Sequence, residues 1–314
     1  MLPRNSFARL SAMDVSDLPI PESITVSGGC KLAFRHYVGQ GEGSRIVVLI
    51  HGSAGHGAQL HGLASGIAAS GEAEVYTLDM RGHGLSGGKA GHAVRHAEQL
   101  CEDIAEFLGF LDRTTPHARI ILGGHSAGGG LALRFSRSRA GHRVSGYLFL
   151  TPYLGLGSPT IRPLFGGWIR VRMNRLRAVI LANVLGIKRF NNMTVISFDL
   201  SGCPDRQSYA PSWSFNTALA MGPGRWIPGA RGIDSGKAVL VVTAGRDECF
   251  YANAYPEAFR SLAPQAEIRT VKNIGHWDVL VDPEVLAITT EWLSRIAKAR
   301  DRQNSPQYAV ESTS

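Results

Sequence analysis

Short apolar runs, each ending in a glycine-rich or polar stretch, recur along the chain and predict β-strands. Most of them are apolar at nearly every position, which is typical of parallel strands covered on both faces. Helix-length stretches lie between them, at residues 60–70, 93–111 and 129–139. This alternation predicts an α/β fold with a doubly wound, mostly parallel sheet. The predicted strands are residues 45–50, 74–78, 119–122, 144–150, 238–243 and 267–271, preceded at one edge by an antiparallel hairpin at residues 23–26 and 31–37.

The alternation of strands and helices is interrupted between residues 152 and 233. Because strands resume afterwards, we interpret this segment as a cap inserted between two strands of the core. Its apolar residues at helical spacing predict one face of a helix, namely Ile169, Met173, Leu176, Ile180 and Val184. We expect a core of residues 21–151 and 234–298, an N-terminal extension at residues 1–20 and a flexible polar tail at residues 299–314.

The formal net charge of +8 is concentrated in the interrupting segment. Residues 152–233 contain two acids, Asp199 and Asp205, against ten basic residues, so the rest of the chain sums to zero. The excess could attract an anionic substrate, hold the cap on an anionic membrane surface, or only keep the protein in solution. We do not expect nucleic-acid binding, because aromatic residues are not interleaved with the basic ones. The basic residues are Arg162, Arg170, Arg172, Arg175, Arg177, Lys188, Arg189, Arg206, Arg225 and Arg231.

The remaining composition predicts a cytoplasmic protein without a cofactor. No run of about 18 uncharged apolar residues indicates a membrane span, and the first residues do not resemble a secretory signal. The four cysteines lack C-x-x-C spacing, so we expect free thiols in a reducing compartment. Histidines and acids lack metal-motif spacing, and the glycine-rich strings lack the lysine of a phosphate loop. The sequence does not indicate an oligomeric state, and peripheral membrane contact through the cap stays open.

The pentapeptide Gly124-His125-Ser126-Ala127-Gly128 matches the pattern G-x-S-x-G between a predicted strand and a predicted helix. A serine on such a sharp turn holds its hydroxyl clear of the sheet, next to the N-terminus of the helix. Flanking glycines let the backbone cross itself without a Cβ clash. The unpaired N–H groups of the helix end suit a developing oxyanion. We therefore interpret Ser126 as a nucleophile.

Two further residues complete a candidate set for acyl chemistry. Asp247 follows the predicted strand at 238–243, and His276 follows the one at 267–271. A serine hydroxyl is a poor nucleophile unless a neutral imidazole accepts its proton and a carboxylate orients that imidazole. We predict His276 as the general base and Asp247 as the acid that orients it.

Other acids and histidines fit these roles less well. Asp79 ends an earlier strand, where a carboxylate more often holds a turn, and Asp278 and Asp282 are too close to His276 in sequence to reach round its ring easily. The remaining histidines are expected to be structural at His51, His83 and His125, and solvated or locally bonded at His36, His56, His61, His92, His96, His117 and His142.

Five motifs occur in a characteristic order, HGSAGHG, LDMRGHGLSGG, GGHSAGG, GRDE and GHWD. With their spacing, the chain resembles the α/β-hydrolase superfamily, nearest the monoacylglycerol lipase and lysophospholipase-like (serine aminopeptidase-like) branch. The resemblance covers residues 23–297 and implies an α/β-hydrolase fold with an inserted cap. It places Ser126, Asp247 and His276 at the family's functional positions.

The same resemblance implies an oxyanion hole. In this fold one N–H donor comes from the residue after the nucleophile and the second from the loop after an earlier strand. We assign these donors to the backbone N–H groups of Ala127 and Ser53. Residues 79–87 match a family loop that is structural, whereas residues 155–231 align with no known cap, and the cap decides the substrate.

We therefore predict a serine hydrolase that cleaves a small-molecule or lipid carboxylic ester, such as an acylglycerol, a lysolipid or a small acyl ester, through an acyl-enzyme on Ser126. A serine nucleophile argues against dehalogenases and epoxide hydrolases of this fold, which attack through an aspartate. Cleavage of amide, thioester or C–C bonds by the same residues stays open. A non-enzymatic ligand-binding sensor is a further alternative, although a pure binder has no chemical need for all three side chains.

Overall fold

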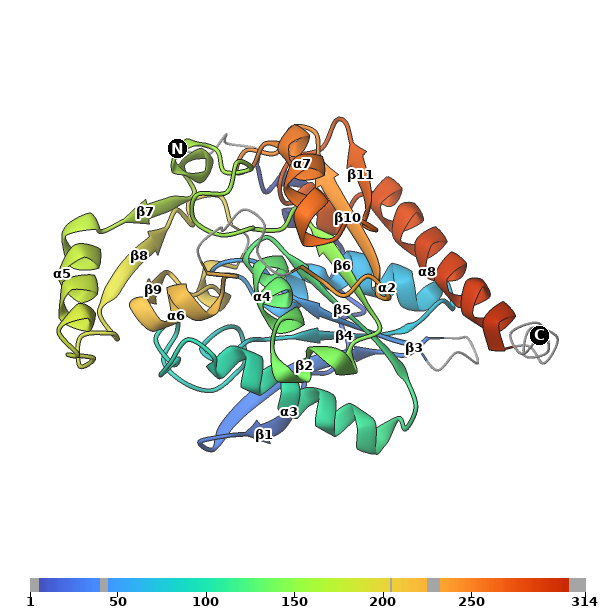
Figure 1. Cartoon of the computed structure of the whole chain (residues 1–314), viewed down its shortest axis with the longest axis horizontal. Coiled ribbons are helices and arrows are strands. Elements are labelled where there is room, and N and C mark those ends of the chain that lie inside the picture. Colours follow the sequence, from blue (N-terminus) through green and yellow to red (C-terminus); the bar gives the residue numbers. More distant parts are fainter. Residues whose placement is uncertain (1–5, 40–44, 204, 225–231, 305–314) are drawn as a thin grey trace, which may run out of the picture.

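The core is an eight-stranded sheet in the order β1-β2-β4-β3-β5-β6-β10-β11 (Figure 1). The structure is a computed structural model that describes residues 6–39, 45–203, 205–224 and 232–304, with side chains described up to residue 298. β1 and β2 form an antiparallel hairpin, β2 pairs antiparallel with β4, and the remaining neighbours are parallel. The strands are β1 (Glu22–Val26), β2 (Cys30–Tyr37), β3 (Arg45–Ile50), β4 (Glu74–Leu78), β5 (Arg119–His125), β6 (Gly146–Leu150), β10 (Ala238–Ala244) and β11 (Glu267–Val271).

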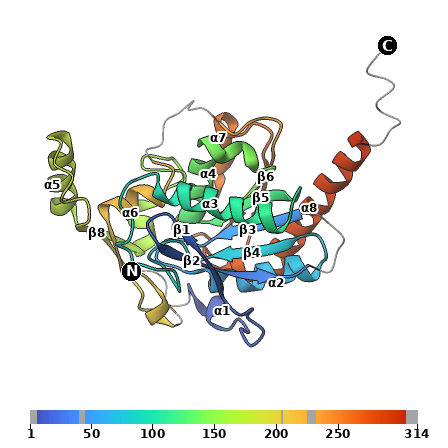
Figure 2. The same cartoon turned by 90° about the horizontal axis from the view of Figure 1, so that it is seen from below.

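Helices cover both faces of this sheet (Figure 2). α2 (His61–Ala69) packs against α8 (Pro283–Asn304) on one face, and α3 (Gln99–Thr114) packs against α4 (Ala127–Ser136) on the other. α7 (Tyr255–Leu262) lies on the same side as α4. The central strands are therefore shielded from water on both sides, which explains their continuous apolar character. Single 3₁₀ turns lie at η1 (Gly57–Leu60), η2 (Arg139–Arg143), η3 (Pro163–Gly167), η4 (Arg206–Ser208), η5 (Ala252–Ala254) and η6 (Asp278–Leu280).

The predicted doubly wound, mostly parallel sheet is confirmed, and the main boundary difference concerns α3. The pattern predicts a helix from residue 93, whereas α3 begins at Gln99. The preceding residues form a turn, in which the Arg95 N–H donates to the Gln99 side chain and the Asn216 side chain donates to the Arg95 carbonyl. One local hydrogen bond and one to a distant residue therefore hold the backbone where the pattern predicts the first helical turn.

The segment between β6 and β10, here called the inserted segment (residues 152–233), carries in its described residues a small sheet and two helices beside the core sheet (Figure 1). Its three strands form an antiparallel sheet in the order β7-β8-β9. This second sheet was not predicted, because its strands are short. The elements are β7 (Ile169–Val171), α5 (Met173–Val184), β8 (Thr194–Phe198), β9 (Ser212–Ser214) and α6 (Phe215–Ala220).

The predicted helix of the inserted segment exists, but its predicted apolar face is only partly confirmed: Leu176 packs against the interior, whereas Met173 is 48% exposed. Ile169 lies in β7, and Ile180 and Val184 are 47% and 77% exposed. The helix instead buries Val179, which packs against Val195 of β8. α5 rests on β8 along one narrow stripe and otherwise lies away from the core sheet (Figures 1 and 2). Contact with a short sheet, and not helical periodicity, therefore decides which side chains are buried.

The N-terminal segment packs onto the body of the protein. It carries the short helix α1 (Ala8–Ser11), and the side chains of Phe7 and Leu10 are buried. The Phe7 ring lies 4.2 Å from the Trp277 ring and 5.7 Å from the Trp168 ring, measured between centroids. Residues 1–5 and 305–314 lie outside the described part of the chain. The first residues of the predicted flexible tail, 299–304, instead continue α8, which ends at Asn304.

No helix in the described part of the chain is long and apolar enough to cross a membrane. Cys30, Cys101, Cys203 and Cys249 are all free thiols.

Candidate active site

Ser126 lies at the junction between β5 and α4, at the carboxyl edge of the parallel strands. Its backbone angles, φ 52° and ψ −116°, are unusual for a residue with a side chain and cost about 1–3 kcal/mol of strain. The two glycines of the pentapeptide make the turn possible. A Cβ on Gly124 would lie 2.3 Å from the Gly128 carbonyl carbon, and one on Gly128 would lie 2.4 Å from the His51 oxygen. Only glycine fits at either position, so the motif holds the serine on a tight turn.

Asp247 and His276 are joined by a hydrogen bond of 2.9 Å between Nδ1 and Oδ2, and each is 2% exposed. Asp247 follows β10, and its other carboxylate oxygen accepts the backbone N–H groups of Cys249 and Phe250, at 2.7 and 2.8 Å. The carboxylate accepts all three of these hydrogen bonds, and the one to His276 can hold the imidazole in the tautomer with a proton on Nδ1. That tautomer leaves Nε2 as the proton acceptor.

The Ser126 hydroxyl makes no hydrogen bond with His276 in the described structure. Nevertheless the two loops are fastened together, because the Nε2–H of His125, next to Ser126, donates to the His276 carbonyl at 3.0 Å. Hydrogen bonds between a nucleophile and its base are often long before substrate binds. The arrangement therefore brings two of the three candidates into direct contact and the third onto the neighbouring loop.

A second carboxylate, Glu248, supports the histidine loop and was not predicted. It accepts the backbone N–H of His276 at 2.7 Å and, through its other oxygen, the hydroxyl of Ser6 at 2.9 Å. Ser6 and Glu248 are 242 residues apart in sequence. The GRDE motif includes this glutamate, but no local pattern indicates what it contacts.

The two residues whose backbone N–H groups were assigned as donors from the sequence lie on the wall of the same cavity as Ser126. Ser53 and Ala127 both line that cavity, and neither N–H has an acceptor among the described residues. A Cβ on Gly52 would lie 3.3 Å from the Cβ of Ser126, so the loop after β3 abuts the serine. Two free N–H groups beside a nucleophile can stabilise negative charge on a carbonyl oxygen.

The competing acids have structural partners. Asp79 accepts the backbone N–H groups of Gly57 and Leu85 at 2.5 and 2.8 Å, so it holds two turns together, as expected. Asp278 accepts the Gly275 N–H at 2.8 Å, and Asp282 pairs with Arg9 at 2.6 Å. None of these three acids makes a described hydrogen bond to the ring of His276.

Three buried histidines surround the site and act as neutral structural groups, as expected. His51 accepts the Met80 N–H at 3.1 Å, and His83 accepts the indole N–H of Trp213 at 2.8 Å. Burial lowers the pKa of His51 to about 4 and that of His83 to about 3, and it lowers the pKa of His125 well below 6.5. These rings therefore stay uncharged at neutral pH and serve as hydrogen-bond partners.

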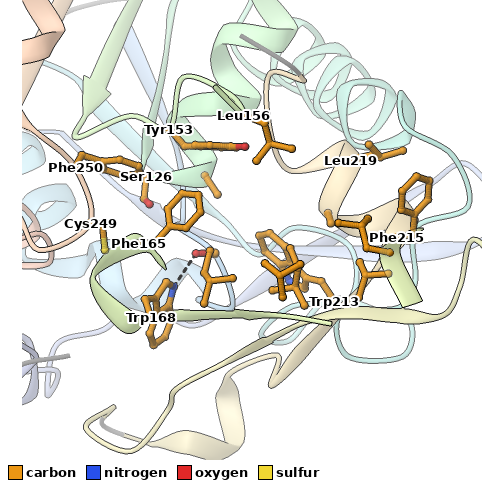
Figure 3. A pocket seen from close by; sticks show the side chains of 18 residues that line it. Ser126, Tyr153, Leu156, Phe165, Trp168, Trp213, Phe215, Leu219, Cys249 and Phe250 are labelled. Atoms are coloured by element: carbon orange, nitrogen blue, oxygen red, sulfur yellow. Dashed lines mark hydrogen bonds between the residues drawn. The ribbon is translucent and has the colours of Figure 1, made fainter. Parts of the chain in front are cut away.

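A cavity of about 150 Å³ extends from Ser126 into the inserted segment, and carbon atoms form most of its wall (Figure 3). Ser126, Cys249 and Phe250 lie at one end, and Phe215 and Leu219 of α6 lie at the other (Figure 3). Side chains of the inserted segment supply much of the lining between them, including Leu156, Phe165, Trp168, Ile169, Val171, Leu176, Val195, Ile196 and Trp213.

Among the described residues, one group of three side chains could approach a metal ion. The ligand atoms of Asp247, Cys249 and His276 lie within 4.8 Å of one another. However, both oxygens of Asp247 are already hydrogen-bonded to neighbours. Burial, reinforced by the Asp247 charge, raises the pKa of the Cys249 thiol well above 9.0, so the thiolate needed for a metal is scarce. The contacts fit an aspartate–histidine pair better than a metal site.

Comparison with known proteins connects this arrangement to a family. The family model of the serine aminopeptidases, S33, matches residues 41–277. A monoacylglycerol lipase of Mycolicibacterium smegmatis is 34% identical over 121 residues, which cover 38% of this chain and 42% of the relative. An uncharacterized abhydrolase domain-containing protein of Dictyostelium discoideum is 32% identical over 108 residues, 34% of this chain and 11% of the relative. The chain therefore spans less than half the length of either relative.

Solved structures share the fold. A soluble variant of monoglyceride lipase from Saccharomyces cerevisiae, in complex with a substrate analogue, superposes with a TM-score of 0.69 at 16% identity and covers 90% of this chain and 97% of that one. A thermophilic esterase from Thermogutta terrifontis superposes with a TM-score of 0.61 at 21% identity, over 88% and 99% of the two chains.

Proposed function

The chain belongs to the serine aminopeptidase (S33) family of α/β-hydrolases, and from this premise we propose that it hydrolyses carboxylic esters with an apolar acyl group through an acyl-enzyme on Ser126. The observation that carries the proposal is the apolar cavity that opens directly onto Ser126, beside the hydrogen-bonded pair Asp247 and His276. The monoacylglycerol lipase relative supports an acyl ester as the substrate.

The proposed chemistry uses each group at a stated atom. The Ser126 oxygen attacks the ester carbonyl while Nε2 of His276 takes the hydroxyl proton. The carbonyl oxygen becomes an oxyanion and accepts hydrogen bonds from the N–H groups of Ser53 and Ala127. The tetrahedral adduct collapses to an acyl-enzyme when His276 gives its proton to the departing alcohol. Water, deprotonated by His276, then releases the acid and restores Ser126.

The cavity supports an acyl chain as the group that is bound. Burying a methylene group against carbon contributes about 0.8 kcal/mol. Each carbon added to the acyl chain should therefore strengthen binding until the cavity is full. We expect kcat/KM for p-nitrophenyl esters to rise with chain length and then to level off or fall. Acyl glycerols and lysolipids of matching chain length are the natural candidates.

The inserted segment is proposed to act as a cap that selects substrates. It supplies much of the cavity wall, so a substrate must pass it to reach Ser126. The basic side chains of Arg170, Arg172, Arg175 and Arg177 in this segment are exposed. The apolar side chains of Ile180, Leu181 and Val184 in α5 are exposed as well. A basic and apolar surface of this kind suits an anionic membrane that presents the ester.

The first experiment treats the protein with a fluorophosphonate probe and maps the labelled residue by mass spectrometry. Ser126 should be labelled, and Ser126→Ala should lose both labelling and ester hydrolysis, because removal of a nucleophile costs several orders of magnitude in kcat. Circular dichroism checks that the variant is folded. Retention of more than about a tenth of kcat in the variant would contradict the assignment.

The same experiment separates the alternatives. A protein that binds esters but is neither labelled nor active at Ser126 would be a ligand-binding sensor. Labelling at Ser126 without turnover of p-nitrophenyl esters or monoacylglycerols would point instead to amide, thioester or C–C bonds, for which the same residues could be used.

A further inference from the structure

One hydrogen bond joins the inserted segment to the loop that carries the Ser53 donor. Trp168 directly precedes β7, and its indole Nε1–H donates to the hydroxyl oxygen of Ser53 at 3.0 Å (Figure 3). The two residues are 115 positions apart in sequence. The bond crosses from the inserted segment to the edge of the core sheet, next to Ser126.

The chemistry of the two groups determines the direction of this bond. An indole nitrogen can only donate, so the Ser53 hydroxyl must be the acceptor. The hydroxyl keeps its own proton for a second hydrogen bond. Among the described residues nothing accepts that proton, although the Ser53 side chain is one of the few polar groups on the cavity wall.

Trp168 is buried between other aromatic rings, so its packing can fix the position of the indole N–H that the hydroxyl accepts. It is 4% exposed, and its ring lies 5.4 Å from the Trp277 ring and 5.5 Å from the Phe198 ring. Trp277 directly follows His276, so the aromatic contacts connect Trp168 to the histidine loop. A hydroxyl that accepts from a fixed donor loses most of its freedom to rotate, and its O–H points away from the indole.

We propose that the Ser53 hydroxyl is a third hydrogen-bond donor to the oxyanion, and that Trp168 is the positioning residue that orients it. The inference rests on the proposed function, because it assumes attack by Ser126 on a carbonyl. The hydroxyl donates to the negative oxygen as the tetrahedral adduct forms and regains its free state when the adduct collapses. No proton is transferred. An O–H···O⁻ bond to a charged oxygen is stronger than a neutral one, so it acts mainly in the transition state.

The test compares Ser53→Ala, Trp168→Phe and the double variant on p-nitrophenyl butyrate. Loss of one oxyanion donor costs about 10²-fold in kcat or more, so Ser53→Ala should lower kcat about 100-fold with KM changed less than about threefold. Trp168→Phe keeps an aromatic ring but loses the N–H, and should lower kcat about tenfold. The double variant should match Ser53→Ala, since nothing is left to orient. Trp292→Phe, at a buried tryptophan of α8, controls for general loss of packing.

A transition-state analogue gives a second measurement. A trifluoromethyl ketone forms a tetrahedral oxyanion with the serine, so its affinity should fall in parallel with kcat/KM in the Ser53 and Trp168 variants. The rate constant of fluorophosphonate labelling should follow the same order and requires no knowledge of the natural substrate. If Trp168→Phe fails to fold, these measurements on Ser53→Ala decide the role of the hydroxyl.

Any other result would contradict one part of the proposal that the Ser53 hydroxyl is an oxyanion donor oriented by Trp168. A Ser53→Ala variant within about threefold of wild-type kcat would show that the hydroxyl is not a donor. Equal losses in both single variants and in the double would show that the hydroxyl only anchors Trp168. A double variant worse than Ser53→Ala would show that Trp168 does not act through Ser53 alone. Activity that persists in Ser126→Ala would instead contradict the proposed function, whatever the Ser53 variants do.

Discussion

At the scale of single residues, the environment of Asp247 distinguishes it from every other acid near the site. One of its oxygens binds the His276 ring, and the other accepts two backbone N–H groups. Both oxygens of Asp79, by contrast, accept hydrogen bonds from backbone N–H groups in turns. The difference is one of partner and not of burial, because both acids are 2% exposed.

Asp247→Asn should lower kcat by up to about four orders of magnitude, because an amide stabilises the wrong imidazole tautomer, as the corresponding change does in serine proteases. Steady-state hydrolysis of p-nitrophenyl butyrate measures the effect. Asp278→Asn is the matched control, since that carboxylate caps the Gly275 N–H in the same loop and should change kcat only a few-fold. A near-silent Asp247→Asn beside a damaging Asp278→Asn would mean that the wrong acid was chosen.

At the scale of elements, α5 is unusual because it presents apolar and basic side chains to solvent together. Val184 is 77% exposed and Leu185, directly after the helix, is 67% exposed. A helix of a globular protein normally turns such residues inward. Because the helix touches the small sheet and lies away from the core, changes on it should affect substrate capture more than chemistry.

Replacement of Arg170, Arg172, Arg175 and Arg177 by glutamine should raise KM for esters presented on anionic vesicles and leave kcat for p-nitrophenyl acetate within a few-fold. The effect should shrink as salt rises, because exposed charges are screened beyond about 8–10 Å at physiological ionic strength. The matched control neutralises four exposed arginines of the core, Arg113, Arg139, Arg260 and Arg269. Equal, salt-independent losses on neutral and vesicle-bound esters would show that the arginines only hold the inserted segment together.

At the scale of the whole molecule, the buried neutral histidines connect stability to pH. His51 and His83 have pKa values lowered by burial to about 4 and about 3, against 6.5 for an ordinary histidine. Between these values and about 6.5 the unfolded chain binds more protons than the folded one. The free energy of unfolding must therefore fall as pH is lowered through this window.

Urea unfolding monitored by circular dichroism should show a falling midpoint between about pH 6.5 and pH 4. His83→Gln keeps an acceptor for the Trp213 indole but cannot be protonated, so it should flatten this dependence. His117→Gln, at an exposed position, is the matched control and should leave the slope unchanged. An unaltered slope in His83→Gln would show that this residue does not contribute to acid destabilisation.

The features that the sequence determined are those in which each residue acts through its near neighbours in the chain. Apolar runs identified β3 and β4 to the residue, because a buried parallel strand needs apolar side chains on both faces. The bounds of β11 were also predicted to the residue, although this edge strand buries only Val271. The tight turn at Ser126 could be predicted from the sequence because only glycine fits at Gly124 and Gly128. The pair Asp247 and His276 was predictable because parallel strands end at one edge of the sheet.

Tertiary structure alone decided the contacts between distant segments. Trp168 meets Ser53 across 115 residues, and Ser6 meets Glu248 across 242. The buried side of α5 likewise depends on β8, and its helical period points to other residues. In each case a side chain finds its partner only because folding brings a distant segment near, and such a partner leaves no spacing in the sequence. The hydrogen bond from Trp168 to Ser53 therefore depends on the tertiary structure, which places the inserted segment beside the loop after β3.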